Sequence, residues 1–270
     1  MYRLLAIDLD GTLLTPRPHK HISERTRLAL RQAVEAGMTL VIATGQNLAV
    51  LQNTCGDLPL NAPQIIENGA VIADIEGHIY HERYLPSEHI LPALELLRAS
   101  GFNRAYHTIH RVYVDQQTPR AREWYRPPVP PVIEVEDVAR LYPLPCIKVV
   151  GIGVEERIRA LRSAFEQSFA GELYVTQSSF DLIEFLHPGV SKGHALQQIA
   201  ADLGIASEEV VAFGDNHNDI GMLQFAGLGV AMGNAHDEVK AVADYVAPSN
   251  AEDGVAVVIE EIVLPAPNPS

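Results

Sequence analysis

The feature of this 270-residue chain that most constrains its fold is a short apolar run that ends in polar residues and recurs along the sequence. Residues 4–7, 39–43 and 210–213 are such runs, and a helical pattern follows the first two. Uninterrupted apolar runs of this length are typical of strands buried on both faces of a parallel sheet. The sequence therefore predicts an α/β fold with a mostly parallel sheet flanked by helices.

Helix signals agree with this order of elements. Ser23 is a suitable N-cap for a helix that continues past Val34, and Gly37 suits its end because glycine tolerates the left-handed backbone that closes many helices. A further helix is expected over 192–203. Residues 64–72 and 78–80 are expected to form a strand, a turn and a second strand.

The pattern changes in the middle of the chain. Short strands are expected at 111–114, 147–150 and 173–175, a helix is expected over 155–168, and prolines cluster at 127–131. This mixture predicts an inserted α+β module. We therefore expect a core formed by residues 1–82 and 188–270, interrupted by an inserted domain over residues 83–187.

Charge and composition limit the partners. The net charge is −14, with 20 basic against 34 acidic residues, which argues against a nucleic-acid partner because phosphate backbones are bound by clustered lysine and arginine. No apolar run approaches the roughly 20 residues of a membrane helix. Cys55 and Cys146 are too few for a disulfide scaffold, so we expect a cytoplasmic protein in which neither cysteine has a role.

The first apolar run ends in two carboxylates. Asp8 and Asp10 are two residues apart, so they project to the same side if extended geometry persists, and Gly11 allows a sharp exit. A carboxylate that attacks a phosphate ester needs a divalent cation to offset the repulsion between two anions, and hard oxygen ligands favour Mg²⁺. Asp8 would then attack, while Asp10 would protonate the leaving oxygen and later deprotonate water.

Other strand ends and helix starts supply the groups that such a reaction needs. Asp215 and Asp219 follow another predicted strand, and a parallel sheet could bring them beside Asp8 to hold the cation. Lys192 at a helix start provides a positive charge for catalysis. Thr44 and Gly45, after the second strand, can offer a hydroxyl group and a close backbone approach to the phosphoryl oxygens.

These segments occur in the order of the motifs of a known family. They are Asp8-Leu9-Asp10-Gly11-Thr12-Leu13-Leu14, Ala43-Thr44-Gly45, Ser191-Lys192-Gly193 and Gly214-Asp215-Asn216-His217-Asn218-Asp219. With them, the chain resembles the haloacid dehalogenase superfamily and, within it, the Cof-type branch of sugar-phosphate phosphatases. Asn68-Gly69-Ala70 and residues 231–235 also resemble segments that recur in that branch.

The resemblance implies a Rossmann-like core, a C2B-like cap domain that selects the substrate, and Mg²⁺ as cofactor. It implies that Asp8 and Asp215 bind the metal through side chains and Asp10 through its carbonyl oxygen, with Asp219 beside them but not bound to the metal. The residues that it places on the phosphoryl group are Leu9, Thr44, Gly45, Lys192 and Asn218. The expected substrate is a small phosphorylated metabolite.

Position 46 departs from the pattern. The family commonly has arginine directly after the Thr-Gly pair, whereas this chain has Gln46. An arginine could bind an anion with two hydrogen bonds and a charge, which glutamine cannot replace. Affinity or substrate choice is therefore expected to differ here, although no chemical role above depends on position 46.

The same residues leave functions other than hydrolysis to be considered. A phosphosugar mutase would use the same nucleophile and acid but would release no phosphate, and a regulator that only binds sugar phosphates would suit the uncharged Gln46. A dehalogenase is disfavoured because halide displacement needs no proton donor such as Asp10. Phosphomonoester hydrolysis through an aspartyl-phosphate is the leading hypothesis.

The 11 histidines do not suggest a second metal site. His107 and His110 have no acidic neighbours in sequence and are expected at the surface, and His217 is expected to be a loop residue without a metal. Trp124 and Tyr125 could form a wall for the substrate or pack the inserted module, and packing is the favoured interpretation.

Overall fold

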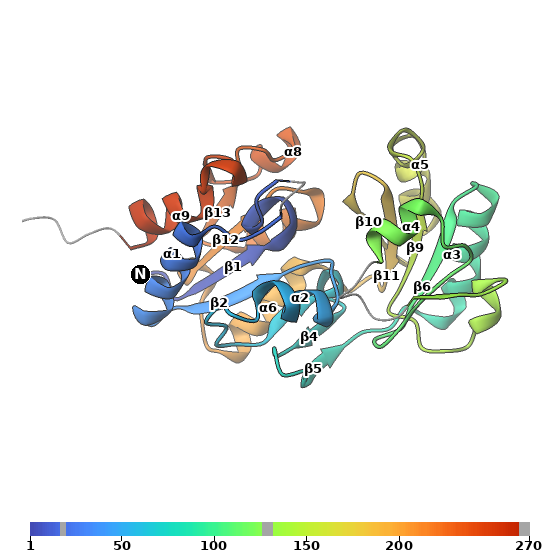
Figure 1. Cartoon of the computed structure of the whole chain (residues 1–270), viewed down its shortest axis with the longest axis horizontal. Coiled ribbons are helices and arrows are strands. Elements are labelled where there is room, and N and C mark those ends of the chain that lie inside the picture. The colour runs from blue at the N-terminus through green and yellow to red at the C-terminus, as the bar shows by residue number, and fades with distance from the viewer. Residues whose placement is uncertain (17–19, 126–131, 265–270) are drawn as a thin grey trace, which may run out of the picture. The chain divides into compact units, whose positions relative to one another are not determined.

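The structure, a computed structural model, describes residues 1–16, 20–125 and 132–264, so the proline cluster at 127–131 lies outside the described residues. The chain divides into two compact units (Figure 1). Unit 1 consists of Met1–Tyr80 and Ser191–Ser270, and unit 2 of His81–Val190. The segment 83–187, predicted to be an insertion, lies within unit 2.

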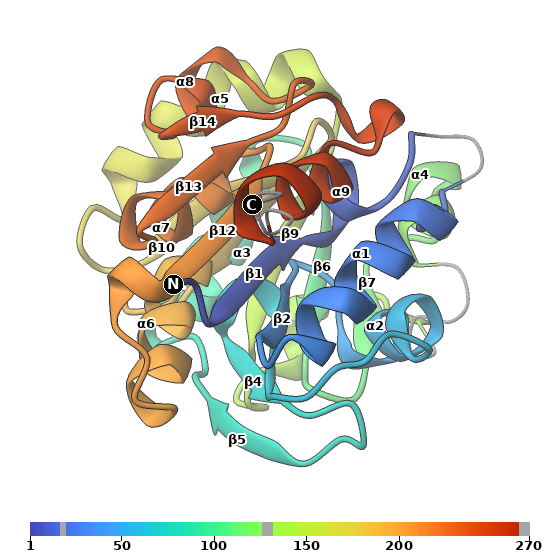
Figure 2. The same ribbon diagram turned by 90° about the vertical axis from the view of Figure 1, so that its left-hand side faces the viewer.

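Unit 1 is built on an eight-stranded sheet, seen with its helices in Figure 2. Its strands are β1 (Leu4–Asp8), β2 (Thr39–Ala43), β3 (Gln64–Ile66), β4 (Val71–Ala73), β5 (Ile79–Glu82), β12 (Val210–Gly214), β13 (Leu228–Ala231) and β14 (Tyr245–Val246). They are ordered β14-β13-β12-β1-β2-β3-β4-β5. The pairs from β14 to β3 are parallel, and β4 runs antiparallel to β3. The predicted, mostly parallel α/β sheet is confirmed.

The helices of unit 1 are α1 (Glu24–Glu35), α2 (Leu48–Cys55), α6 (Lys192–Asp202), α7 (Ile220–Phe225), α8 (Asp237–Lys240) and α9 (Gly254–Val258). One sheet face, which includes Leu4 and Ala6, packs against apolar residues of α6 and α7. Alternate residues point to the opposite face. There α1 contacts both β2 and α9, and the two helices lie side by side in Figure 2.

The ends of α1 follow the sequence signals. The hydroxyl of Ser23 accepts a hydrogen bond from the backbone N–H of Thr26, which satisfies a donor that the first turn leaves without a partner. Gly37 has a φ of 93° just after the helix, a conformation that favours glycine. Both predicted boundaries are confirmed.

The single strand predicted over 64–72 is wrong. The chain forms β3, then a helical turn η2 (Glu67–Gly69), then β4, which pairs antiparallel with β3. The backbone φ angles of Glu67, Asn68 and Gly69 are 50°, 58° and 94°, and no strand contains such values. The reversal makes β3 and β4 a hairpin.

Unit 2 has a six-stranded sheet of its own. The strands are β6 (Asn103–His107), β7 (Val112–Val114), β8 (Val132–Glu134), β9 (Lys148–Ile152), β10 (Tyr174–Ser179) and β11 (Leu182–Leu186), in the order β10-β11-β9-β6-β7-β8. Helices α3 (Ser87–Ala99) and α5 (Glu155–Ser168) pack on one face. The short helix α4 (Pro119–Trp124) packs on the other face. The predicted α+β character is confirmed.

Histidine placement in unit 2 is partly different from the prediction. His110 is exposed, but His107 at the end of β6 is buried and its Nε2 lies 2.9 Å from the hydroxyl of Tyr125. The expected surface position of His107 is wrong because its strand lies inside the sheet, between β7 and β9. Trp124 and Tyr125 pack against the apolar cluster under α4, as predicted.

Cys55 and Cys146 are buried free thiols. Among the helices that the structure describes, none combines the length and the apolar character needed to span a membrane.

Candidate active site

Three strand ends of unit 1 meet at one edge of the sheet. Strand β1 lies between β2 and β12, with Asp8 opposite Ala43 and Ile7 opposite Phe213. The segments that follow these strands in the chain therefore leave the sheet together. This is the edge at which open α/β sheets bind ligands.

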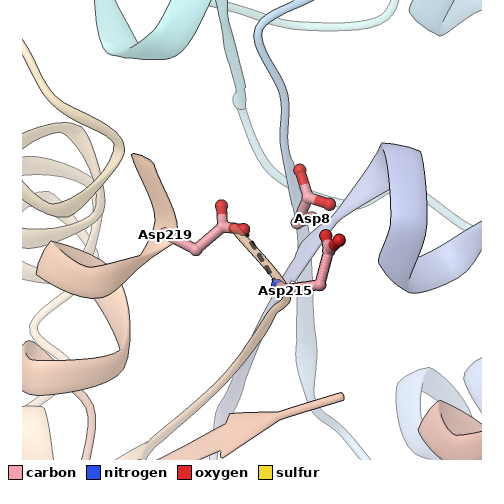
Figure 3. A group of neighbouring side chains, drawn as sticks. All are labelled: Asp8, Asp215 and Asp219. Atoms are coloured by element: carbon pink, nitrogen blue, oxygen red, sulfur yellow. Dashed lines mark hydrogen bonds between the residues drawn. The ribbon is translucent and has the colours of Figure 1, made fainter. Parts of the chain in front are cut away.

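An acidic cluster occupies this edge. Asp8 ends β1, while Asp215 and Asp219 belong to the turn that follows β12 (Figure 3). One carboxylate oxygen from each of the three lies within 4.8 Å of the other two. The convergence predicted from three separate sequence positions is thus present in the structure.

Lys192 joins two of these acids. It is the first residue of α6, and its Nζ lies 2.5 Å from Asp8 Oδ1 and 2.6 Å from Asp219 Oδ1. Only 1% of the Lys192 side chain is exposed. Burial alone would lower its pKa, but the charges of Asp219 and Asp8 outweigh burial and raise it. Lys192 is therefore a buried, permanently charged partner of the predicted nucleophile.

Asp219 has both oxygens engaged by the protein. Its Oδ1 binds Lys192, and its Oδ2 accepts hydrogen bonds of 3.0 Å from the backbone N–H groups of Asp215 and Asn216 (one is dashed in Figure 3). Asp219 therefore holds Lys192 and the turn in place at the same time. The expectation that Asp219 stands beside the metal without binding it stays a prediction.

Asp215 is held against the segment that follows β1. Its Oδ1 accepts a 3.1 Å hydrogen bond from the Thr12 hydroxyl, and a Cβ on Gly11 would lie 2.3 Å from its Oδ2. Gly11 also has a φ of 93°, so both space and backbone conformation require glycine there. Burial and the charge of Asp219 raise the pKa of Asp215 to about 7.

The cluster fits a divalent cation. Asp8 Oδ2 is buried and has no hydrogen-bond partner among the described residues, an arrangement that costs free energy unless a ligand satisfies it. Burial and the nearby charge of Asp219 raise the pKa of Asp8. The single positive charge of Lys192 lowers it but does not outweigh these effects. Buried carboxylate oxygens with excess negative charge are the donor set that hard cations such as Mg²⁺ prefer.

Asp10 belongs to a separate group of contacts. It lies in the irregular helical turn η1 (Leu9–Leu13), and Gln46 Nε2 donates a 2.9 Å hydrogen bond to its Oδ2. The ammonium of Lys20 forms a short ion pair with its Oδ1. Burial acts to raise the pKa of Asp10, but the charge and hydrogen bond of Lys20, helped by Gln46, lower it.

The residues predicted to contact a phosphoryl group lie around the same edge. Leu9 follows Asp8 with its side chain fully buried, so only its backbone could reach a ligand. Thr44 is buried, and its hydroxyl accepts a 3.1 Å hydrogen bond from the backbone N–H of Gln46. Asn218 is buried, and its Nδ2 donates a 2.9 Å hydrogen bond to Oδ1 of Asn68. A Cβ on Gly45 would lie 3.0 Å from that same oxygen.

Sequence reasoning missed two participants. Lys20 contacts Asp10 from ten residues further along the chain, and no local signal in the sequence points to it. Asn68 is the other: the sequence identifies it only as part of a segment that resembles one recurrent in the Cof-type branch. Its Asn-Gly pair between two apolar runs is a hairpin signal and could have revealed the turn. His217 lies next to His236 and 4.0 Å from Glu238.

Comparisons with known proteins agree with this geometry. The family model of the haloacid dehalogenase-like hydrolases, which describes the sequences of that family, matches residues 5–259 of this chain. The 5-amino-6-(5-phospho-D-ribitylamino)uracil phosphatase YcsE of Bacillus subtilis is 34% identical over 264 residues, which cover 97% of this chain and 96% of that protein. The pyridoxal phosphate phosphatase YbhA of Escherichia coli is 31% identical over 274 residues, with coverages of 94% and 96%. The solved structure of the subclass IIB sugar phosphatase BT4131 has a TM-score of 0.84 at 26% identity, covering 97% of this chain and all of that one.

Proposed function

The chain belongs to the Cof-type haloacid dehalogenase-like hydrolases, and from this premise we propose that it removes phosphate from small phosphorylated metabolites through an aspartyl-phosphate on Asp8. It is a phosphoric monoester hydrolase, as its relatives are named phosphatases. The observation that carries the proposal is the contact between Asp8 and Lys192, beside an Asp8 oxygen with no partner among the described residues.

In the first step, Asp8 attacks the phosphorus atom of the ester. A bond forms between a carboxylate oxygen of Asp8 and phosphorus, and the bond from phosphorus to the ester oxygen breaks. Lys192 holds Asp8 Oδ1 in place and contributes positive charge where negative charge gathers. Asp10 gives its proton to the leaving oxygen.

In the second step, a water molecule attacks the phosphorus of the aspartyl-phosphate. Asp10 takes the proton from this water, the new bond from oxygen to phosphorus forms, and the bond to Asp8 breaks. The ionised Asp10 that Lys20 and Gln46 stabilise is the form that this step requires. The first step requires protonated Asp10, so its ion pair with Lys20 must open when substrate binds.

We propose that the bound metal is Mg²⁺. Asp8 and Asp215 would hold it through side-chain oxygens and Asp10 through its carbonyl oxygen. A bound divalent cation would offset the repulsion between the Asp8 carboxylate and the phosphoryl oxygens. The phosphoryl oxygens would be held by Lys192, the Asn218 amide, the Thr44 hydroxyl and the backbone near Leu9 and Gly45.

Unit 2 is proposed to select the substrate. It is inserted between the segment that carries Gln46 and the helix that carries Lys192, so it can vary without disturbing the residues that act on phosphate. Among the residues of unit 2 that the structure describes, two helices pack on one face of its sheet and the short α4 packs on the other.

Phosphate release from a panel of metabolites tests the proposal. The panel contains sugar phosphates, nucleotides, pyridoxal phosphate and 5-amino-6-(5-phospho-D-ribitylamino)uracil, because the last two are named as substrates of the relatives YbhA and YcsE. Release that depends on added Mg²⁺ and stops with a chelator is expected. Isomerised sugar phosphate without release would instead identify a mutase, and tight binding without turnover a regulator.

A further inference from the structure

The turn η2 has an unusual backbone. In the part of the chain that the structure describes, the non-glycine residues with positive φ are Glu67 at 50°, Asn68 at 58° and Asp253 at 56°. Two of these three are adjacent, and Gly69 follows with 94°. Each non-glycine residue in this conformation costs about 1 kcal/mol, so the surroundings must hold the turn in place.

The turn η2 is hydrogen-bonded to the loop after β2. The backbone N–H of Asn68 donates a 3.0 Å hydrogen bond to the carbonyl of Thr44, and the N–H of Glu67 donates one of 2.9 Å to the carbonyl of Gln46. The side-chain amide of Asn68 lies so close to Gly45 that an added Cβ would be 3.0 Å from its oxygen. The backbone of the proposed phosphate loop is therefore fixed by η2.

The same asparagine reaches the turn after β12. Asn68 Oδ1 accepts the 2.9 Å hydrogen bond from Asn218 Nδ2, and both residues are buried. Asn218 stands next to Asp219, which holds Lys192. One hydrogen bond to a fixed oxygen sets the plane of the Asn218 amide and leaves its second N–H for a ligand.

The turn also lies against the start of α6. A Cβ on Gly69 would be 2.4 Å from the carbonyl oxygen of Ser191, the residue directly before Lys192. Thus η2 touches the loop after β2, the turn after β12 and the start of α6, three of the segments that supply phosphate-binding groups.

We propose that Asn68 is a positioning residue for the phosphoryl site: its left-handed backbone lets one residue hold the Thr44–Gly45 loop with its N–H and the Asn218 amide with its side chain. This inference deepens the proposed function and rests on it. Asn68 itself takes no part in bond making.

The positioning role of Asn68 is tested by measuring the effect of one substitution in three proteins that differ at position 68. The effect of Asn218→Ala on the dissociation constant of inorganic phosphate, with Mg²⁺ present, is measured in wild type, Asn68→Gly and Asn68→Asp. Glycine keeps the positive φ and removes the acceptor, whereas aspartate keeps an acceptor. We expect Asn218→Ala to weaken binding by about tenfold in wild type and in Asn68→Asp, but by less than about threefold in Asn68→Gly.

Two controls separate positioning from folding and from the proposed function. Asp253→Gly makes the same backbone change at a left-handed position outside η2, and it should leave phosphate affinity and kcat/KM at wild-type values. If wild type releases no phosphate from any ester, the proposed function fails, yet the binding measurement still decides the role of Asn68. An equal effect of Asn218→Ala in all three backgrounds would overturn the role of Asn68.

Discussion

Gln46 Nε2 lies 2.9 Å from Oδ2 of Asp10, so glutamine here is a partner of the proposed general acid. The other oxygen of Asp10 is paired with Lys20. The positive charge that the family resemblance leads one to expect at position 46 is missing, but Lys20 supplies a charge to this carboxylate from another segment. This arrangement weakens the main argument for a regulator without catalysis, which was the missing charge at position 46.

Removing either partner of Asp10 is expected to slow the reaction. Lys20 and Gln46 stabilise the ionised Asp10 that takes the proton from water. Where this second step sets kcat, Gln46→Ala and Lys20→Met should each lower kcat by about fivefold, the equivalent of one hydrogen bond near 1 kcal/mol, with KM nearly unchanged. The double variant Lys20→Met/Gln46→Arg should recover part of the loss because it returns a charge. Steady-state kinetics on one ester decides this; a raised KM at constant kcat would mean that these residues bind substrate instead.

Metal binding should stabilise unit 1. Mg²⁺ at about 100 times its dissociation constant is expected to add about 2.7 kcal/mol to the free energy of unfolding of the wild type. Asp215→Asn removes a proposed ligand and should abolish most of this increase. The control Asp202→Asn changes an exposed acid of α6 and should keep it. Equal stabilisation of all three proteins, measured by thermal unfolding, would place the metal elsewhere.

Gly11 and Gly37 form a matched pair for testing the packing beside Asp215. Both have a φ of 93°, but a Cβ at position 11 meets Asp215 Oδ2 at 2.3 Å, whereas nothing lies within 4 Å of one at position 37. Gly37→Ala should cost about 1 kcal/mol of stability with normal kcat/KM. Gly11→Ala should in addition lower kcat/KM by roughly a hundredfold, since small displacements of reacting groups are costly. Similar kinetics of the two variants would contradict this packing.

The stability of unit 2 should fall below neutral pH because of His107. Burial, together with the charge of Lys148, lowers the pKa of His107 well below its ordinary value. The unfolded chain binds a proton near pH 6.5 while the folded unit does not, so stability is complete above about 6.5 and falls as pH drops, by at most about 1.4 kcal/mol per pH unit.

Fluorescence of Trp124 provides the measurement. It is the only tryptophan of the chain and lies in unit 2, so its signal during urea unfolding follows that unit. His107→Gln should lose less stability than wild type between about pH 7 and pH 5.5. Parallel losses in both proteins would show that His107 is not the group responsible.

Strong local patterns explain how much of the fold and site could be predicted. Asp8 ends β1 and Asp215 directly follows β12, and these adjacent parallel strands present their carboxyl ends at one edge, so the meeting of the two acids follows from the pattern alone. The ends of α1 follow from Ser23 and Gly37 in the same way. Such features depend on a few neighbouring residues.

Features that depend on distant contacts were not predictable from the pattern. In segment 64–72 the Asn68-Gly69 pair signals a turn, but the left-handed conformation of Glu67, which its contact with Gln46 helps to hold, has no such signal. Lys20 and Asp10 are ten residues apart, and the sequence between them has no helix or strand pattern that would predict their ion pair. Burial of His107 follows from the order of strands in the sheet, which the sequence of one strand does not encode.

The most direct test of the central claim is to find the phosphorylated residue. The enzyme is mixed with a good substrate and Mg²⁺, quenched in acid during turnover, and digested for peptide mass spectrometry. The account predicts a phosphoryl group on Asp8, and it predicts that Asp8→Asn carries none and hydrolyses the substrate at least a thousandfold more slowly, by an order-of-magnitude expectation for a lost nucleophile. Phosphate release by Asp8→Asn at the wild-type rate would contradict the account.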